Sequence, residues 1–427
     1  MTTPHSTQPA GAAAAVPTTP PPSAGASSAP GSPTTAGATA PVWRAVIWGL
    51  YSLLLMQQLP VIFRQADFSE SLLYYAVDDL IEYPTVAVWP IEVFKSLGWD
   101  SAGGFAALLV VVQALVVWAC TRWGTKETAF LWLACISAMG PLMLSRMDLL
   151  PGALVAWALA LVVRHPRTSG ALLAVATGMK LWPGLVAAAL LGSWRRVLAF
   201  VATGVALVAA SIAVHGLDRT VSPLVYQGDR GIQVESLFAT PLLLREGVTV
   251  EFANSMSFEV FGPGVQRLTG VADLAQLLVV LGAAVLGVVT ARRWTGHTAV
   301  ACATSIVWLI IATNKVFSPQ YLLWVLPLML VVVTTTTSKV AHVMAWACVP
   351  LTVMTTLIYP LMYPELLEQA FTPVMLLWVR NLMVLGLTVL SLVWWWQEWR
   401  AAPATPRRGA TAPAPAPTPA PVEQAAL

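Results

Sequence analysis

Charged and hydrogen-bonding side chains interrupt the apolar runs of this 427-residue sequence at four places. A charge at membrane depth costs a few kcal/mol or more, so each such residue is a candidate functional residue. The four segments read SRMDLLPGALVAWAL, TGMKLWPGL, YQGDRGIQVESLFATP and NKVFSPQYLLWVLPL. The four segments contain the cations Arg146, Lys180, Arg230 and Lys315. These cations are suited to bind a phosphate or pyrophosphate head group whose lipid tail lies in the bilayer.

Lys180 is the most informative of these cations because it lies in an otherwise uncharged run beside Trp182 and Pro183. Either Asp148 neutralises its ammonium, or an anionic ligand does so. Lys315 lies next to a second helix break at Pro319, so both cations could reach one phosphate. The hydrogen-bonding residues that we expect to contact substrate are Tyr83, Asp148, Gln233, Glu235, Asn314, Ser318, Gln320 and Tyr321.

Each of these residues also has a purely structural alternative. Arg146 and Asp148 could form a local ion pair, with Asp148 as a helix N-cap. The ammonium of Lys180 could extend to the membrane interface. Asp229–Arg230 could be a solvated turn, and Tyr321 could belong to an interfacial aromatic belt.

Acidic residues are concentrated in the segment 64–101. Transfer of a sugar from an activated lipid needs one carboxylate that deprotonates the acceptor hydroxyl. No Ser-His-Asp order, Gly-rich phosphate loop or metal-ligand spacing indicates a competing chemistry. The acids of this segment that could act as the base include Asp67, Glu70, Asp78, Asp79 and Glu82.

The composition excludes a soluble protein, because 57% of the residues are hydrophobic and only 10% are charged. Soluble domains carry roughly 25% charged residues. The net charge of +3 and the lack of a dense basic tract exclude a nucleic-acid-binding protein. The four cysteines and five histidines are scattered, which argues against a disulfide framework and against a metal site. The candidate residues must therefore be positioned by membrane helices.

Twelve apolar runs are candidates for these helices, since a bilayer core of about 30 Å needs about 20 residues per span. They lie near 43–63, 102–121, 128–145, 149–163, 168–181, 183–193, 197–215, 272–291, 298–313, 321–337, 341–358 and 374–396. The fifth and sixth runs are short and could form one re-entrant element around Pro183, so we expect eleven to thirteen spans. The sequence predicts an all-α polytopic integral membrane protein.

Positive charges predict the orientation of this protein. With a cytoplasmic N-terminus, the pairs Arg195–Arg196 and Arg292–Arg293 lie in inner loops, and most of the 20 acidic residues fall on the outer side. The long segments 64–101 and 216–271 are then outer loops, which predicts an active site on the outer face of the plasma membrane. Residues 1–41 and 401–427 are rich in Ala, Pro and Thr, so we expect disordered cytoplasmic tails around a transmembrane domain over 42–400.

The same segments resemble glycosyltransferase family 87, the polyprenol-phosphate-mannose-dependent mannosyltransferases of actinobacterial envelopes. The resemblance rests on YY followed by EYPT, then on RMDLLPGALVAWALA, GMKLWPGL, DRGIQVESLFATP, NKVFSPQYLLW, and YPLMYPELL before RN. These pieces occur in order over roughly residues 64–385. The combination of NKVFSPQYLLW with RGIQVES is the most specific part of the match.

The resemblance implies the C-type membrane glycosyltransferase fold with large outer loops, and an outward-facing active site. It also implies a polyprenyl-phosphate hexose donor and an inverting mechanism with an acidic base in the first outer loop. Family members usually place this aspartate shortly before the aromatic pair, at a spacing that here lands near Ser71. Because this position is not acidic, the candidates for the base are Asp67 as first choice, then Glu70, Asp78 and Asp79.

We therefore expect an inverting hexosyltransferase, specifically a mannosyltransferase. It would move a sugar from polyprenyl-phosphate-mannose, or a similar lipid-linked sugar, to an envelope glycolipid or polysaccharide. Lys180, Arg230 and Lys315 would hold the donor phosphate, so that neither a cofactor nor a divalent metal is expected. The alternatives are a secondary transporter or lipid flippase that uses the same polar residues as a substrate path, and a non-catalytic family member.

Overall fold

The structure is a computed structural model that describes residues 42–65, 68, 72, 74, 80–98, 101–228 and 230–403, with residues 227 and 228 described by their backbone. These residues belong to one compact unit, built almost entirely of helices. The N-terminal tail predicted over 1–41, and the predicted C-terminal tail from residue 404 onward, lie outside the described residues.

The described elements follow one another as helices, with one short hairpin between α9 and α10. Their bounds are α1 Val42–Arg64, α3 Thr85–Ser96, α4 Ala102–Trp123, α5 Lys126–Met139, η1 Gly140–Leu144, α6 Leu149–Ala160, α7 Pro166–Met179, α8 Pro183–Val186, η2 Ala187–Leu190, α9 Trp194–Gly228, β1 Thr249–Ala253, β2 Ser257–Phe261, α10 Val265–Ala291, α11 Gly296–Thr313, η3 Pro319–Tyr321, α12 Leu322–Thr335, α13 Lys339–Thr356, η4 Leu357–Leu361, α14 Tyr363–Leu367 and α15 Phe371–Ala401.

Eight helical segments in the described part of the chain are long and apolar enough to cross a membrane. They are Val42–Arg64, Ala102–Trp123, Lys126–Leu144, Trp194–Tyr226, Val265–Ala291, Gly296–Thr313, Lys339–Leu361 and Phe371–Ala401. Two further apolar helices, Leu149–Ala160 and Pro319–Thr335, are shorter. The prediction of a helical membrane protein is thus confirmed in this coarse form, whereas twelve spans and the C-type fold stay predictions.

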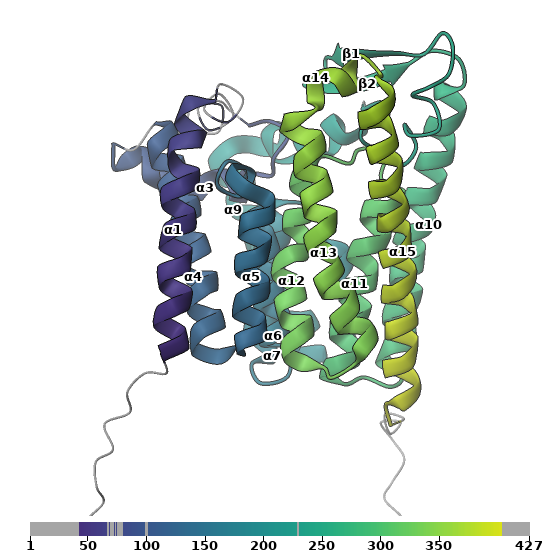
Figure 1. Cartoon of the computed structure of the whole chain (residues 1–427). Helices are drawn as coiled ribbons and strands as arrows, with labels where there is room; N and C mark the ends of the chain where they lie inside the picture. The colour runs from purple at the N-terminus through teal and green to yellow at the C-terminus, as the bar shows by residue number, and fades with distance from the viewer. Residues whose placement is uncertain are drawn as a thin grey trace, which may run out of the picture. The chain divides into compact units, whose positions relative to one another are not determined.

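Long helices run side by side through the unit, and the start of α1 and the end of α15 lie at the same end of it (Figure 1). The hairpin β1–β2 and α14 lie at the opposite end, which we call the hairpin end (Figure 1). The two strands pair antiparallel, with Thr249 opposite Phe261 and Glu251 opposite Glu259. Among the described residues, these two strands are the elements that the all-α prediction did not include.

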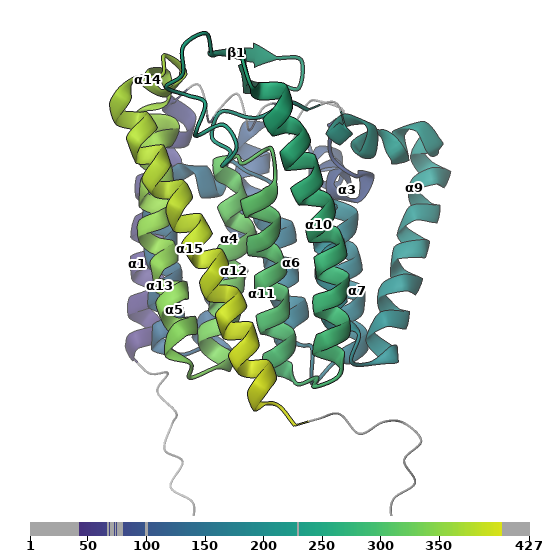
Figure 2. The same cartoon turned by 90° about the vertical axis from the view of Figure 1, so that its right-hand side faces the viewer.

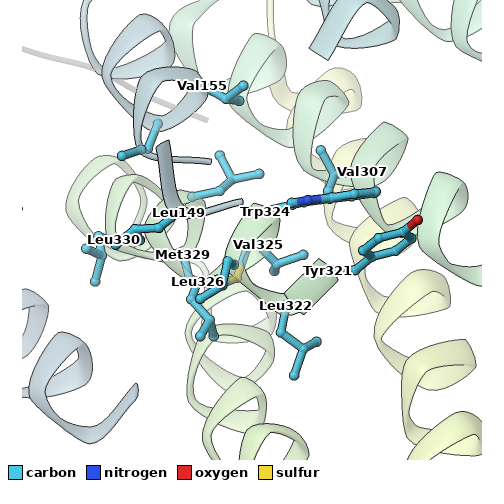
Figure 3. Packing of buried hydrophobic residues seen from close by; sticks show 14 of the residues in the cluster. Leu149, Val155, Val307, Tyr321, Leu322, Trp324, Val325, Leu326, Met329 and Leu330 are labelled. Carbon is cyan, nitrogen blue, oxygen red and sulfur yellow. The ribbon is translucent and has the colours of Figure 1, made fainter. Parts of the chain in front are cut away.

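The core is formed largely by the inward faces of α5, α6, α11 and α12, and Figure 3 shows the part of it that includes side chains of α6, α11 and α12. Trp132 and Trp308 are fully buried in it. Helices α6 and α12 touch backbone to backbone, because a Cβ at Gly152 would collide with the carbonyl of Leu323. This close approach brings the start of α6 next to the start of α12.

Candidate functional site

Lys180 and Asp148 form an ion pair at the junction of three helices. The ammonium Nζ of Lys180 lies 2.6 Å from Oδ1 of Asp148, and the same oxygen accepts a hydrogen bond of 2.6 Å from the indole Nε1 of Trp324. The side chain of Asp148 is 0% exposed and that of Lys180 is 17% exposed. Oδ2 of Asp148 is buried without a hydrogen-bond partner among the described residues. The pair is therefore almost dry, and the lysine is its side with access to a ligand.

Three aromatic rings surround this ammonium. Nζ of Lys180 lies 5.0 Å from the ring centre of Tyr83, 5.5 Å from that of Tyr321 and 5.6 Å from that of Trp324. Tyr321 and Trp324 stack with their ring centres 3.9 Å apart, and Figure 3 shows the two rings next to each other. Trp182 also stacks on Trp324, with ring centres 5.0 Å apart. Ring faces attract a cation, so the rings of Tyr83, Tyr321 and Trp324, which we call the aromatic pocket, stabilise a charged lysine that is largely shielded from solvent.

The local sequence explains why Lys180 leaves its helix at this point. Helix α7 ends at Met179, Lys180 has an extended backbone, and α8 begins at Pro183. A proline at the first helical position has no N–H to lose, so it starts the new helix and ends the old one. Gly178 packs directly on Val86 of α3, where a Cβ would be 2.9 Å from a methyl carbon. The end of α7 is thereby held against the segment that carries Tyr83.

Residues 80–83 are fixed by the second half of α9. Arg219 donates to the carbonyl oxygens of Leu80 (3.0 Å) and Tyr83 (3.1 Å), and the hydroxyl of Ser222 donates to that of Ile81 (2.9 Å). Three main-chain carbonyls in four residues are thus satisfied by one helix face. This anchoring sets the position of Tyr83 over Lys180.

Glu82 is carried by the same anchored segment. Its Oε1 accepts a hydrogen bond of 2.6 Å from the hydroxyl of Tyr74, and its side chain is half-buried. The charge of Glu82 and that of Arg230 both act on the hydroxyl of Tyr226. Glu82 is thus the acid of the segment 64–101 that the described contacts place beside the aromatic pocket. The charge count along the sequence could not separate it from its neighbours.

Arg230 approaches the pocket from the segment that follows α9. Its guanidinium lies 5.7 Å from the ring centre of Tyr226, and its charge interacts with both Tyr226 and Tyr321. Its Nε is buried without a hydrogen-bond partner among the described residues. The neighbouring Gly231 donates its N–H to Oε2 of Glu259 (3.0 Å), and a Cβ there would collide with this carboxylate. Strand β2 therefore fixes the backbone beside Arg230.

Lys315 forms an ion pair with a different acid from the one that pairs with Lys180. Its Nζ lies 3.2 Å from Oδ1 of Asp273 on α10, and its carbonyl accepts the N–H of Gln233 (3.0 Å). The side chain of Asn314 accepts the N–H of Val316 (2.9 Å), which shapes the turn after α11. Whether Lys180 and Lys315 share one phosphate stays a prediction.

The remaining candidates of this turn, Ser318, Gln320 and Tyr321, lie in η3 or directly before it. Ser318 immediately precedes η3, in which Gln320 is half-buried and Tyr321 is buried. Tyr321 is the member of this group that the structure places in the aromatic pocket. The phosphate and substrate roles of the others rest on the sequence alone.

Glu235 lies in a buried polar cluster with Arg380 and Asn381 of α15. Nη2 of Arg380 donates to the carbonyl (3.0 Å) and to Oε2 (3.3 Å) of Glu235, and Asn381 donates to Oγ1 of Thr240 (2.6 Å). Burial raises the pKa of Glu235 to about 7, although the Arg380 guanidinium opposes that shift. These contacts attach the segment 230–240 to α15. The dipeptide Arg380–Asn381 is a structural requirement that charge spacing did not single out.

Arg146 contacts η4, the short helix that follows α13. Its Nη2 donates to the hydroxyl of Tyr359 (3.1 Å), and its charge interacts with Tyr363. Asp148 precedes α6, yet its side chain makes no capping hydrogen bond; its Oδ1 instead accepts from Lys180 and Trp324. The N-cap alternative for Asp148 is therefore replaced by a long-range pair.

Some candidates lie outside the described residues. They are Asp67, Glu70, Asp78, Asp79 and Asp229. In the part of the chain that is described, no group of three or more His, Cys, Asp or Glu side chains is arranged to hold a metal ion.

Comparison with known proteins gives one match. The sequence profile of glycosyltransferase family 87 matches residues 81–319, a range that runs from Glu82 and Tyr83 through Lys180 and Arg230 to Lys315. Neither a characterised protein nor a solved structure matches the chain significantly. Because the profile covers more than half of the 427 residues, the chain belongs to glycosyltransferase family 87 and is a membrane glycosyltransferase.

Proposed function

We propose that this membrane glycosyltransferase moves a hexose, specifically mannose, from a polyprenyl-phosphate donor to an envelope glycolipid or glycan of an actinobacterium. The observation that carries the proposal is the aromatic pocket around Lys180, with Arg230 beside it. A lipid-linked phosphate presents its charge at the membrane surface, at the depth where a helix break exposes this lysine. Aromatic rings next to the cations also suit the faces of a sugar ring.

The proposed reaction is a single inverting displacement. The acceptor oxygen attacks the anomeric carbon, the bond from that carbon to the phosphate oxygen breaks, and the bonding electrons leave with the phosphate. The acceptor proton passes to a carboxylate. Lys180 and Arg230 stabilise the departing phosphate through charge-assisted contacts, and Lys315 is the third cation assigned to this task.

The base in this proposal is an acid of the segment 64–101. Asp67, Glu70, Asp78 and Asp79 keep their place as candidates. Glu82, the fifth acid named for this segment, gains support because Tyr74 donates a hydrogen bond to its carboxylate and because Tyr83, the next residue, lies over Lys180. One hydrogen-bond donor leaves a carboxylate with free lone pairs for a substrate hydroxyl.

The proposal includes twelve spans in the C-type arrangement, cytoplasmic termini and a plasma-membrane location. The hairpin end, which carries residues 80–83 and 230–261, is then the outer face. This orientation is supported by the basic pairs of the opposite loops, Arg195–Arg196 and Arg292–Arg293.

Purified protein in liposomes, with polyprenyl-phosphate-[14C]mannose and an envelope lipid extract, tests the proposal. We expect label in a glycolipid or glycan and release of polyprenyl phosphate. A transporter or flippase would move the labelled donor across the bilayer without consuming it. Consumption of a nucleotide sugar in place of the lipid donor would refute the donor assignment.

A further inference from the structure

Helix α9 changes direction at Gly216. This glycine has φ 80° and ψ 169°, a left-handed conformation that L-residues with a side chain rarely adopt. The chain before it crosses the unit lengthwise, and the chain after it runs across the hairpin end (Figure 2). Only 6% of the most apolar window of α9 is buried inside the protein, so most side chains of the lengthwise part point away from the protein and would face lipid in a bilayer. A bend at the end of such a helix is where the chain would leave the hydrocarbon core.

The segment 217–228 after this bend has two distinct faces. One face carries Leu217, Val221, Leu224 and Val225, whose spacing of four, three and one residues places them together on a helix. These four side chains are between 37% and 64% exposed. A row of exposed aliphatic side chains on a short helix is the pattern of helices that lie in a membrane interface.

The other face contacts segments of the protein that border the candidate site. It carries Arg219 and Ser222, which bind the carbonyls of residues 80–83, and Tyr226, whose hydroxyl donates to the carbonyl of Ser255 in the hairpin turn. Just before the bend, His215 accepts a hydrogen bond of 3.2 Å from Trp89 of α3. The segment thus joins α3, the anchored segment 80–83 and the hairpin.

The exposed aliphatic face is continuous with the exposed apolar side chains before the bend, such as Val208, Ile212 and Val214. We propose that Leu217, Val221, Leu224 and Val225 form an interfacial surface that rests in the head-group region of the leaflet at the hairpin end. Its partner is the lipid bilayer itself, because the surface continues a lipid-facing helix across a single residue.

This surface would set the depth of the reaction. The bilayer holds one face of the segment 217–228, and the other face holds Tyr83 over Lys180. The pocket is thereby kept at the level where the phosphate of a membrane lipid lies. This last step rests on the proposed function, whereas the contact with lipid does not.

Depth-dependent fluorescence quenching tests the contact. The four native cysteines are buried, so Leu224→Cys can be labelled selectively with an environment-sensitive dye in liposomes. Lipids spin-labelled near the head group should quench this dye at least about twofold more than lipids labelled at the chain end. Leu281→Cys, an exposed position in the middle of α10, should show the reverse order, and Glu368→Cys should be quenched by neither. Quenching at position 224 no stronger than at 368 would overturn the proposal, as would efficient crosslinking of two copies through position 224.

Enzyme kinetics test whether this surface sets the depth of the reaction. Val221→Ser combined with Leu224→Ser should raise KM for the lipid-linked donor about tenfold with kcat nearly unchanged, whereas Val271→Ser on exposed α10 should leave both unchanged. Retained KM in the double variant would refute the role in setting depth. If the wild-type protein transfers no sugar from a lipid donor, the proposed function fails while the quenching result stands by itself.

Discussion

Removal of the Lys180 charge should destabilise the protein, and removal of both charges of the pair should not. In Lys180→Met, the fully buried Asp148 keeps only the indole N–H of Trp324, and its second oxygen has no partner among the described residues. Breaking a buried ion pair from one side costs about 3–5 kcal/mol, because a buried charge is left uncompensated. If an anionic ligand were the only partner of the ammonium, this variant would fold normally because it would remove an unpaired charge. The 2.6 Å contact with Asp148 predicts the opposite result.

The double variant Lys180→Met with Asp148→Asn removes both charges and so separates folding from binding. Replacing a buried pair by neutral groups is often close to neutral in stability. Its stability should therefore return to within about 1 kcal/mol of the wild type. A phosphate ligand should still bind more weakly by about 1.5–3 kcal/mol, which is about 10- to 150-fold in Kd, because a hydrogen bond to a charged group is lost.

Two measurements on the same preparations check this reasoning. Unfolding in mixed micelles gives the stability of the wild type, both single variants and the double variant, and titration with a non-hydrolysable lipid-phosphate sugar gives Kd. Lys339→Met, an exposed lysine at the start of α13, is the matched control and should change neither quantity. Wild-type affinity in a stable double variant would refute the phosphate role of Lys180. Wild-type stability of Lys180→Met would refute the ion pair.

Three further results follow from the structure and the proposed topology. In intact cells, Asp229→Cys should react with an impermeant maleimide from outside and Arg195→Cys should not; the opposite pattern would reverse the orientation. Neutralising the true base should lower kcat about 10²- to 10⁴-fold with donor binding retained, whereas Glu92→Gln, an exposed acid on α3, should be silent in the same transfer assay. The acids to compare are Asp67, Glu70, Asp78, Asp79 and Glu82. Gly152→Ala should lower the unfolding free energy by about 1–3 kcal/mol because it forces α6 from α12, while Gly386→Ala, with open space around it, should not destabilise; equal effects would contradict the close contact.

The helices could be predicted because lipid leaves the backbone few choices. A chain in hydrocarbon must satisfy its N–H and C=O groups internally, so apolar runs become helices. The run predicted over 341–358 lies in the helical segment Lys339–Leu361, and the break expected at Pro183 separates α7 from α8. The hairpin and the helical segment after Gly216 could not be found this way. Both depend on contacts with residues far along the chain, such as the hydrogen bond from Tyr226 to Ser255.

The site was predictable as a list of residues and not as a set of partners. Lys180 was singled out because a charge in an apolar run demands an explanation. The sequence left two explanations open, Asp148 or a ligand, because the choice depends on how α6, α7 and α12 pack. The packing supplies Asp148, and it also supplies Tyr83 and Trp324 around the ammonium. Arg219 was missed altogether, since a cation that binds carbonyl oxygens has no signature in the order of charges.

The charges of the pocket suit a reaction in which negative charge moves rather than accumulates. Lys180 is already paired with Asp148, so the resting pocket is not strongly positive. A polyprenyl-phosphate sugar is a diester with one negative charge, and the released phosphate monoester carries between one and two. The base gives up its negative charge when it accepts the acceptor proton, at the same moment as the phosphate gains one. In the proposed reaction the total charge therefore stays nearly constant, and catalysis would depend on cations beside the departing phosphate. We propose Lys180, held by its aromatic rings, and Arg230, with an unpartnered Nε in the described structure, as these cations.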